Sequence, residues 1–121
     1  MVQRLVYFLH EFLKGLAVFQ IFELTQDDPK TLQERTLKLS EEAGELAQAV
    51  LSVTKAPGSA YKNHSIEDVR EEAVDATIVA LSILAQACSS RSEFESELER
   101  LMSEKCGKWR EKVLEQEASA E

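Results

Sequence analysis

Apolar residues recur at intervals of three and four along most of this chain, which is the spacing of amphipathic α-helices. The pattern predicts four helices, over residues 3–24, 28–55, 65–88 and 92–114. No segment alternates apolar and polar residues in the way that a half-buried strand does. We therefore expect an all-α fold, a four-helix bundle with short connections between neighbouring helices.

Residues with strong capping preferences mark the predicted helix boundaries. Asp28-Pro29 is typical of a helix start, and Pro57-Gly58 of the loop that follows that helix. Capping boxes, in which a serine precedes an acid by three residues, open the third helix at Ser65 and the fourth at Ser92. The tail beyond about residue 115 is expected to fray.

The length of 121 residues suits one domain covering 1–121. The third helix has no charge from Ala76 to Ser90 and is apolar around most of its circumference, so we expect burial on nearly all sides. Long amphipathic helices in so short a chain leave apolar surface uncovered, and packing against further copies is the usual way to bury it. The bundle is therefore expected to be completed by oligomerisation, as a homodimer or homotetramer.

The formal net charge is −8, and no basic surface of the kind that nucleic acids require is evident from the sequence. Two cysteines without metal-binding spacing suit a reducing, cytoplasmic environment. The apolar N-terminal region is interrupted by charges, and its longest uncharged run, residues 15–22, is too short to span a membrane. An acidic protein can still bind a polyphosphate if metal ions supply positive charge.

Two pairs of acids are spaced three residues apart, Glu42 with Glu45 in the second predicted helix and Glu72 with Asp75 in the third. Each pair therefore projects from one side of its helix, where like charges repel each other. Because 22 of the 121 residues are acidic, such pairs are common by chance. Taken alone, they are equally consistent with a solvated surface.

The residues around these acids favour a buried cluster. Apolar residues flank the acids of the second helix on two sides, as Leu39, Ala43, Leu46 and Val50 on one face and Leu37, Gly44 and Leu51 on another. A glycine inside a helix, such as Gly44, suggests close approach by a neighbour. Antiparallel packing of the second and third helices would gather four or five carboxylates, which Mg²⁺ would neutralise.

The strings EExxE (Glu41, Glu42, Glu45) and ExxD (Glu72, Asp75), with 26 residues between them, resemble the signature of the all-α nucleotide pyrophosphohydrolases. The local sequences KLSEEAGELAQAV and EEAVDATIVAL are similar to those of MazG-like members. The resemblance covers residues 30–88 well and the last helix loosely. It implies Mg²⁺-dependent hydrolysis of an NTP or dNTP to a nucleoside monophosphate and pyrophosphate, with Mn²⁺ as a possible substitute for Mg²⁺.

The resemblance also implies residue roles. Glu42, Glu45, Glu72 and Asp75 would be the Mg²⁺ ligands, and Glu41 would orient or deprotonate the attacking water or help to hold a further ion. The segment Glu104–Arg110 resembles a basic, phosphate-contacting segment of the family, which would give this role to Lys105, Lys108 and Arg110. A solvated basic turn near a helix end is an equally good interpretation of these three residues.

Other functions are consistent with the same residues. The chain could be a non-catalytic regulatory or interaction module, a bundle stabilised by Ca²⁺ or Mn²⁺, or a pyrophosphohydrolase with a different substrate such as phosphoribosyl-ATP. Neither histidine follows a glutamate by three residues, so the ligand pattern of di-iron bundles is absent. There is also no glycine-rich phosphate loop.

Overall fold

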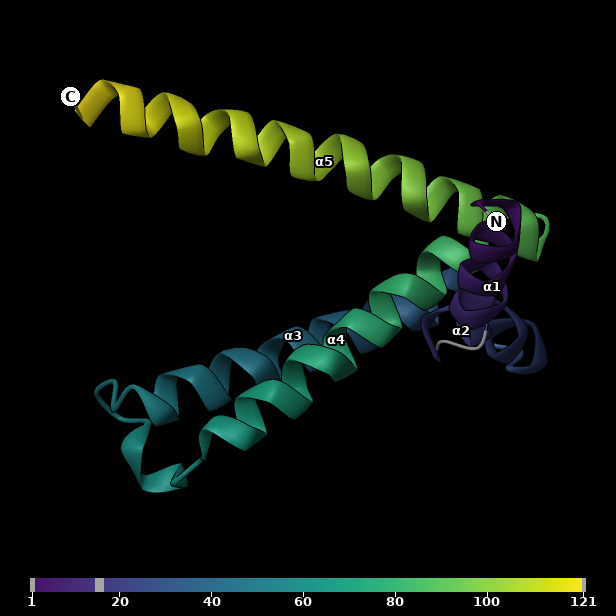
Figure 1. Cartoon of the computed structure of the whole chain (residues 1–121). Coiled ribbons are helices and arrows are strands. Elements are labelled where there is room, and N and C mark those ends of the chain that lie inside the picture. The colour runs from purple at the N-terminus through teal and green to yellow at the C-terminus, as the bar shows by residue number, and fades with distance from the viewer. Residues whose placement is uncertain (1, 15–16, 121) are drawn as a thin grey trace.

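The computed structural model describes residues 2–14 and 17–120, and this part of the chain contains helices and no strand. The elements in chain order are α1 (Val2–Lys14), α2 (Ala17–Asp27), α3 (Leu32–Val53), the short 3-10 helix η1 (Ala60–Lys62), α4 (Ile66–Gln86) and α5 (Arg91–Ala120) (Figure 1). The all-α class is therefore confirmed. Five α-helices are described where the sequence predicted four.

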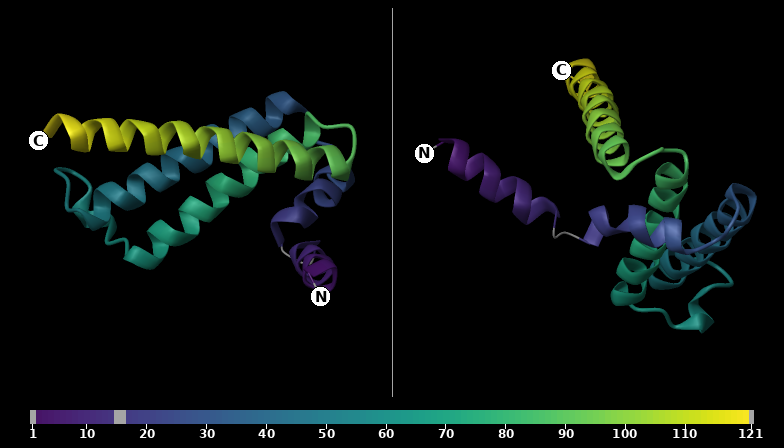
Figure 2. Two further views of the ribbon diagram at one scale, coloured as in Figure 1. Left: turned by 45° about the horizontal axis from the view of Figure 1, so that its top comes forward. Right: turned by 90° about the vertical axis from the view of Figure 1, so that its right-hand side faces the viewer.

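The additional helix arises at the N-terminus, where the predicted helix 3–24 corresponds to α1 and α2. Residues 15 and 16, which the prediction placed inside that helix, lie outside the described residues. Residues 2–9 of α1 are all exposed, and α1 projects from the remaining helices (Figure 2). None of the described helices combines the length and the apolar character needed to cross a membrane.

Helix α3 begins at Leu32, so the start predicted at Asp28-Pro29 is wrong by about one turn. Thr31 is the N-cap, since its hydroxyl accepts a hydrogen bond from the Glu34 N–H at 3.1 Å. In return, the Glu34 carboxylate accepts one from the Thr31 N–H at 3.3 Å. The reciprocal box satisfies two N–H groups, whereas an aspartate cap satisfies one, which explains the later start.

Replacement of Thr31 by alanine should lower the free energy of unfolding by about 1 kcal/mol, because the cap of α3 is lost. Urea denaturation monitored by circular dichroism measures the change. Thr36→Ala is a matched control, since the Thr36 hydroxyl lies within the same helix and only donates to the Leu32 carbonyl at 2.9 Å. Equal losses in the two variants would contradict the assignment of Thr31 as the cap.

The capping box predicted for the third helix is confirmed at Ser65 and Asp68, which exchange hydrogen bonds of 3.3 and 2.7 Å. The fourth predicted helix, α5, starts one residue earlier than expected, and Ser90 rather than Ser92 accepts a bond from the Glu93 N–H, at 3.1 Å. Helix α5 also continues to Ala120, beyond the end predicted at residue 114. Alanine and glutamate, which dominate this tail, are good helix formers.

Helices α3 and α4 run antiparallel and side by side, and they form the most extensive helix pair in the described chain (Figure 1). Helix α2 crosses one end of this pair. The core lies there and consists of Ile21 and Phe22 from α2, Ala85 from α4 and Phe94 from α5, with Val18, Leu81, Leu84, Cys88 and Leu98 packed around them. The rings of Phe22 and Phe94 stack with centroids 6.3 Å apart.

Much of the surface predicted to be buried is exposed in the single chain. On α4 only Ser82 and Ala85 are fully buried, so the expectation that this helix is covered on nearly all sides is wrong. On α3, Leu37 and Leu51 are exposed, and a Cβ added to Gly44 would meet no atom within 4 Å. The close neighbour expected at Gly44 is therefore not found among the described residues.

Candidate metal centre

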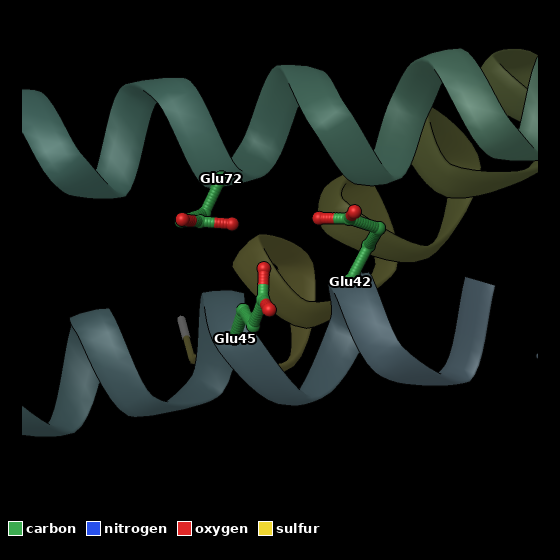
Figure 3. A group of neighbouring side chains, drawn as sticks. All are labelled: Glu42, Glu45 and Glu72. Carbon is green, nitrogen blue, oxygen red and sulfur yellow. The ribbon is translucent and has the colours of Figure 1, made fainter. Parts of the chain in front are cut away.

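The antiparallel pair of α3 and α4 brings three glutamates together, two from the middle of α3 and one from the N-terminal third of α4. Glu42 and Glu45 project from successive turns of α3, and Glu72 projects from α4 towards them (Figure 3). One carboxylate oxygen from each residue lies within 4.8 Å of the other two. The predicted grouping of acids from the second and third helices is confirmed for these three residues.

Two of the three carboxylates have an oxygen that is buried and has no hydrogen-bond partner. These atoms are Oε2 of Glu42 and Oε2 of Glu72. Glu42 as a whole is only 7% exposed. Because a buried carboxylate oxygen without a partner is destabilising, a cation bound between the two helices would stabilise both of these residues.

Mutual repulsion raises the pKa of the Glu45 carboxyl. The main cause is the nearby charge of Glu42, followed by partial desolvation and by the charge of Glu72. Since the folded-state pKa lies above the ordinary value, the ionised Glu45 carboxylate destabilises the fold at neutral pH. That destabilisation decreases as the pH falls through the raised pKa and is fully lost below the ordinary value of 4.5.

Neutralising Glu45 should therefore raise the free energy of unfolding at neutral pH when divalent ions are removed with EDTA. Glu45→Gln keeps the shape of the side chain and removes its charge. Glu111→Gln is the matched control, since Glu111 lies on the exposed part of α5 away from the three glutamates. A lower stability for Glu45→Gln than for the control, measured by urea denaturation in EDTA, would show that the three charges do not repel one another.

Lys38 lies one turn before the cluster and partly compensates its charge. Its Nζ is 3.1 Å from a carboxylate oxygen of Glu42 and 3.3 Å from one of Glu41. Hydrogen bonds to these two carboxylates raise the pKa of Lys38. The ion pair between Lys38 and Glu42 uses Oε1 of the Glu42 carboxylate, so the buried Oε2 of the same carboxylate has no partner.

Asp75, the fourth predicted ligand, does not belong to this group. It is exposed and borders a shallow hollow on the outer side of α4 together with Glu67, Glu71 and Val74. Three residues along an α-helix correspond to a rotation of about 300°, so Asp75 is turned by about 60° from Glu72. That rotation directs Asp75 away from the line between α3 and α4. Glu41, the predicted catalytic residue, is also exposed but lies beside Glu42 and is held by Lys38.

The structure does not bring the predicted phosphate-binding residues Lys105, Lys108 and Arg110 to the glutamates of the same chain. All three are exposed on α5, which diverges from α3 and α4 beyond the core (Figure 1). Lys108 pairs with Glu104 on its own helix at 3.4 Å. Any contact between these basic residues and the acidic cluster would therefore require a different chain.

A buried arginine that the sequence analysis did not identify holds this end of the molecule together. Arg35 lies seven residues before Glu42, on the same inward face of α3, and is only 6% exposed. It donates hydrogen bonds to the backbone carbonyls of Thr25 and Asp28 at 3.2 and 2.8 Å and to the Gln86 side chain at 2.6 Å. Arg35 and Glu42 are seven residues apart, which places them on the same face of a helix. This spacing was the signal in the sequence that could have identified Arg35.

A hollow of about 280 Å³ adjoins the acidic cluster through Lys38. Its apolar lining comes from α2 and α4, and its basic lining comes from α3 and the preceding turn. The apolar residues are Ile21, Leu24, Ile78 and Val79, and the basic residues are Lys30, Arg35 and Lys38. Its volume is close to the lower limit of small-molecule sites, about 300 Å³. Thr25, Asp28 and Ser82 complete the lining, so the hollow combines an apolar floor with side chains of both charges.

The donor set fits a hard divalent cation. Oxygens bound to one Mg²⁺ in octahedral geometry are separated by about 2.9 to 4.2 Å, which small side-chain rotations would produce from the observed cluster. The two unpartnered buried oxygens are available as ligands without breaking any hydrogen bond. Three carboxylates and no sulfur or imidazole favour Mg²⁺, Mn²⁺ or Ca²⁺ over zinc or copper.

Comparisons with models of known protein families, with curated proteins and with solved structures find no match for this chain.

Proposed function

We propose that this protein is a Mg²⁺-dependent nucleotide pyrophosphohydrolase of the MazG-like type, which converts a nucleoside triphosphate into a nucleoside monophosphate and pyrophosphate. The observation that carries the proposal is that Glu42 and Glu72, which belong to one carboxylate cluster between α3 and α4, each have a buried oxygen without a hydrogen-bond partner. The EExxE and ExxD strings that resemble the family's signature contain these same residues.

The arrangement suits a polyphosphate substrate. Glu42, Glu45 and Glu72 would hold the cation, and Asp75 could join them only after a rotation of its side chain. The bound Mg²⁺ would supply charge neutralisation for the phosphates. The adjoining hollow would hold the base or sugar, and Lys38, which lines the hollow and contacts Glu42, would lie between the two parts of the substrate.

The proposed reaction needs no nucleophile from the protein. The oxygen of a water molecule attacks the α-phosphorus, the bond from that phosphorus to the bridging oxygen breaks, and pyrophosphate leaves with the bridging oxygen. Glu41 would accept the proton released by the water, a role that its exposed carboxylate next to Glu42 permits. Positioning and electrostatics would then account for most of the rate enhancement, as is usual for phosphoryl chemistry.

A substrate panel tests this proposal. The purified protein is incubated with NTPs, dNTPs and phosphoribosyl-ATP, with Mg²⁺, Mn²⁺ or EDTA, and pyrophosphate and monophosphate are measured together. We expect equimolar release of the two products that depends on the metal ion, and ¹⁸O from labelled water in the monophosphate. Failure to release pyrophosphate from every nucleotide would overturn the enzymatic proposal and favour a non-catalytic metal-binding module.

A further inference from the structure

Lys38 lies on α3 in line with two glutamates of the acidic cluster. Lys38, Glu42 and Glu45 are separated by four and three residues, so they occupy successive turns on one face of the helix. The Lys38 Nζ is 3.1 Å from Oε1 of Glu42 and 3.3 Å from a carboxylate oxygen of Glu41. Lys38 therefore supplies a positive charge to the most buried glutamate of the cluster.

A divalent cation in the cluster would have to share the Glu42 carboxylate with this ammonium group. The cation would bind the buried Oε2 of Glu42, which has no partner, while Lys38 pairs with Oε1 of the same carboxylate. The two positive centres would then be on the order of 5 Å apart, a distance at which like charges repel each other appreciably. The Lys38 ammonium and a divalent cation therefore compete for Glu42.

Lys38 can leave this carboxylate easily. Its side chain is 49% exposed, and its second partner, Glu41, is exposed as well. Exposed ion pairs of this kind contribute little to stability, and the four-carbon stem of lysine reorients freely. Release of the Nζ from Glu42 therefore requires no rearrangement of the helices.

The position to which the Nζ moves is given by the hollow of about 280 Å³, which Lys38 also lines. Three basic residues and one acidic residue line this hollow, although the net charge of the chain is −8. The acidic residue, Asp28, lies 3.9 Å from the guanidinium group of Arg35. Lys30 forms no ion pair with any residue that the structure describes. A released Lys38 ammonium would thus join an excess of positive charge, where an anionic group would bind.

We propose that Lys38 is an exchangeable counter-ion of the metal centre. It neutralises Glu42 when no metal ion is bound, leaves that carboxylate when a divalent cation binds, and then pairs with an anionic group of the ligand in the adjoining hollow. The first exchange concerns the metal centre alone. The second rests on the proposed function, since a phosphate is the anionic group that the proposed substrate carries. Because coupling between two sites is reciprocal, an anion that holds Lys38 also raises the affinity for the cation.

The first exchange is tested by titration with Mn²⁺ in the absence of any nucleotide, with the free ion measured by electron paramagnetic resonance. Lys38→Met keeps the apolar stem and removes the competing charge, so it should bind Mn²⁺ about 3- to 10-fold more tightly than the wild type. Lys38→Arg keeps the charge and should not tighten binding. Lys30→Met is the matched control, since Lys30 lines the same hollow without pairing with Glu42.

A purely structural role for Lys38 predicts the opposite sign. If the lysine held Glu42 in position for the metal ion, Lys38→Met would bind Mn²⁺ more weakly, and that result would overturn the proposal. Equal binding by Lys38→Met and the wild type would overturn it too. The tighter binding should also disappear when Glu42→Gln is added to Lys38→Met. If it persisted in the double variant, the ion would be bound elsewhere and the proposal would be wrong.

The second exchange is tested by calorimetric titration with inorganic pyrophosphate at a Mg²⁺ concentration that saturates every variant. Lys38→Met should bind pyrophosphate about 10-fold more weakly than the wild type, because a charge-assisted hydrogen bond is lost. Lys62→Met is the control, since the Lys62 Nζ bonds to the Gln48 side chain at 2.9 Å and does not line the hollow. Unchanged pyrophosphate binding by Lys38→Met would overturn this second exchange.

Neither titration measures turnover, so failure of the enzymatic proposal is distinguishable from failure of this inference. If no nucleotide released pyrophosphate in the substrate panel, tighter Mn²⁺ binding by Lys38→Met would still establish the first exchange. The expected signature is a pair of opposite effects in one variant, a gain in affinity for the cation and a loss in affinity for the anion.

Discussion

Glu42→Gln is expected to remove the rise in melting temperature that Mg²⁺ causes in the wild type and to reduce pyrophosphate release by about 100-fold or more. Glutamine preserves the size of the side chain but offers a neutral amide in place of the buried Oε2, which has no other partner in the fold. Since Glu42 is the most buried of the three glutamates, no neighbouring carboxylate can easily replace it. Differential scanning fluorimetry with and without Mg²⁺, together with a pyrophosphate assay, measures both effects.

Glu41→Gln is the matched variant for this prediction. Glu41 is the adjacent residue and also pairs with Lys38, so its replacement controls for the loss of that ion pair. The proposed proton-accepting role predicts that Glu41→Gln retains the Mg²⁺-dependent stabilisation and loses turnover. If Glu42→Gln instead showed the same Mg²⁺-dependent shift as the wild type, the three glutamates would not be the metal site.

Arg35→Leu is expected to lower the free energy of unfolding by about 3 kcal/mol, equivalent to a fall of roughly 10 °C in melting temperature. The substitution removes a buried charge together with hydrogen bonds to two backbone carbonyls and to Gln86. The carbonyls of Thr25 and Asp28 at the end of α2 would then lack these donors. Thermal denaturation followed at 222 nm measures the loss.

The control for Arg35 is Arg100→Leu. Arg100 is exposed on α5 and pairs with Glu97 at 2.6 Å and Glu104 at 3.5 Å within its own helix. Ion pairs of this exposed kind contribute at most about 0.5 kcal/mol. Comparable losses in the two variants would mean that Arg35 does not hold α2, α3 and α4 together.

Local sequence rules predicted the helical class and part of the capping, because these depend on residues close together in the chain. The box at Ser65 and Asp68 was predicted correctly, since both partners lie within one turn. The start of α3 was misplaced because Asp28-Pro29 and Thr31 offered competing caps, and only the reciprocal bonds with Glu34 distinguish them. Burial of α4 was overestimated because apolar composition does not reveal whether the covering surface belongs to the same chain.

The sequence by itself showed that two helices each carry acids three residues apart, and that such acids project from neighbouring positions on a helix. Only the tertiary structure established which acids meet. The rotation of α4 about its axis directs Glu72 towards Glu42 and Glu45 and turns Asp75 to the outer surface. That rotation is determined by how α4 packs against α3, α2 and the first turns of α5, and such contacts between distant residues leave no signal in the local spacing.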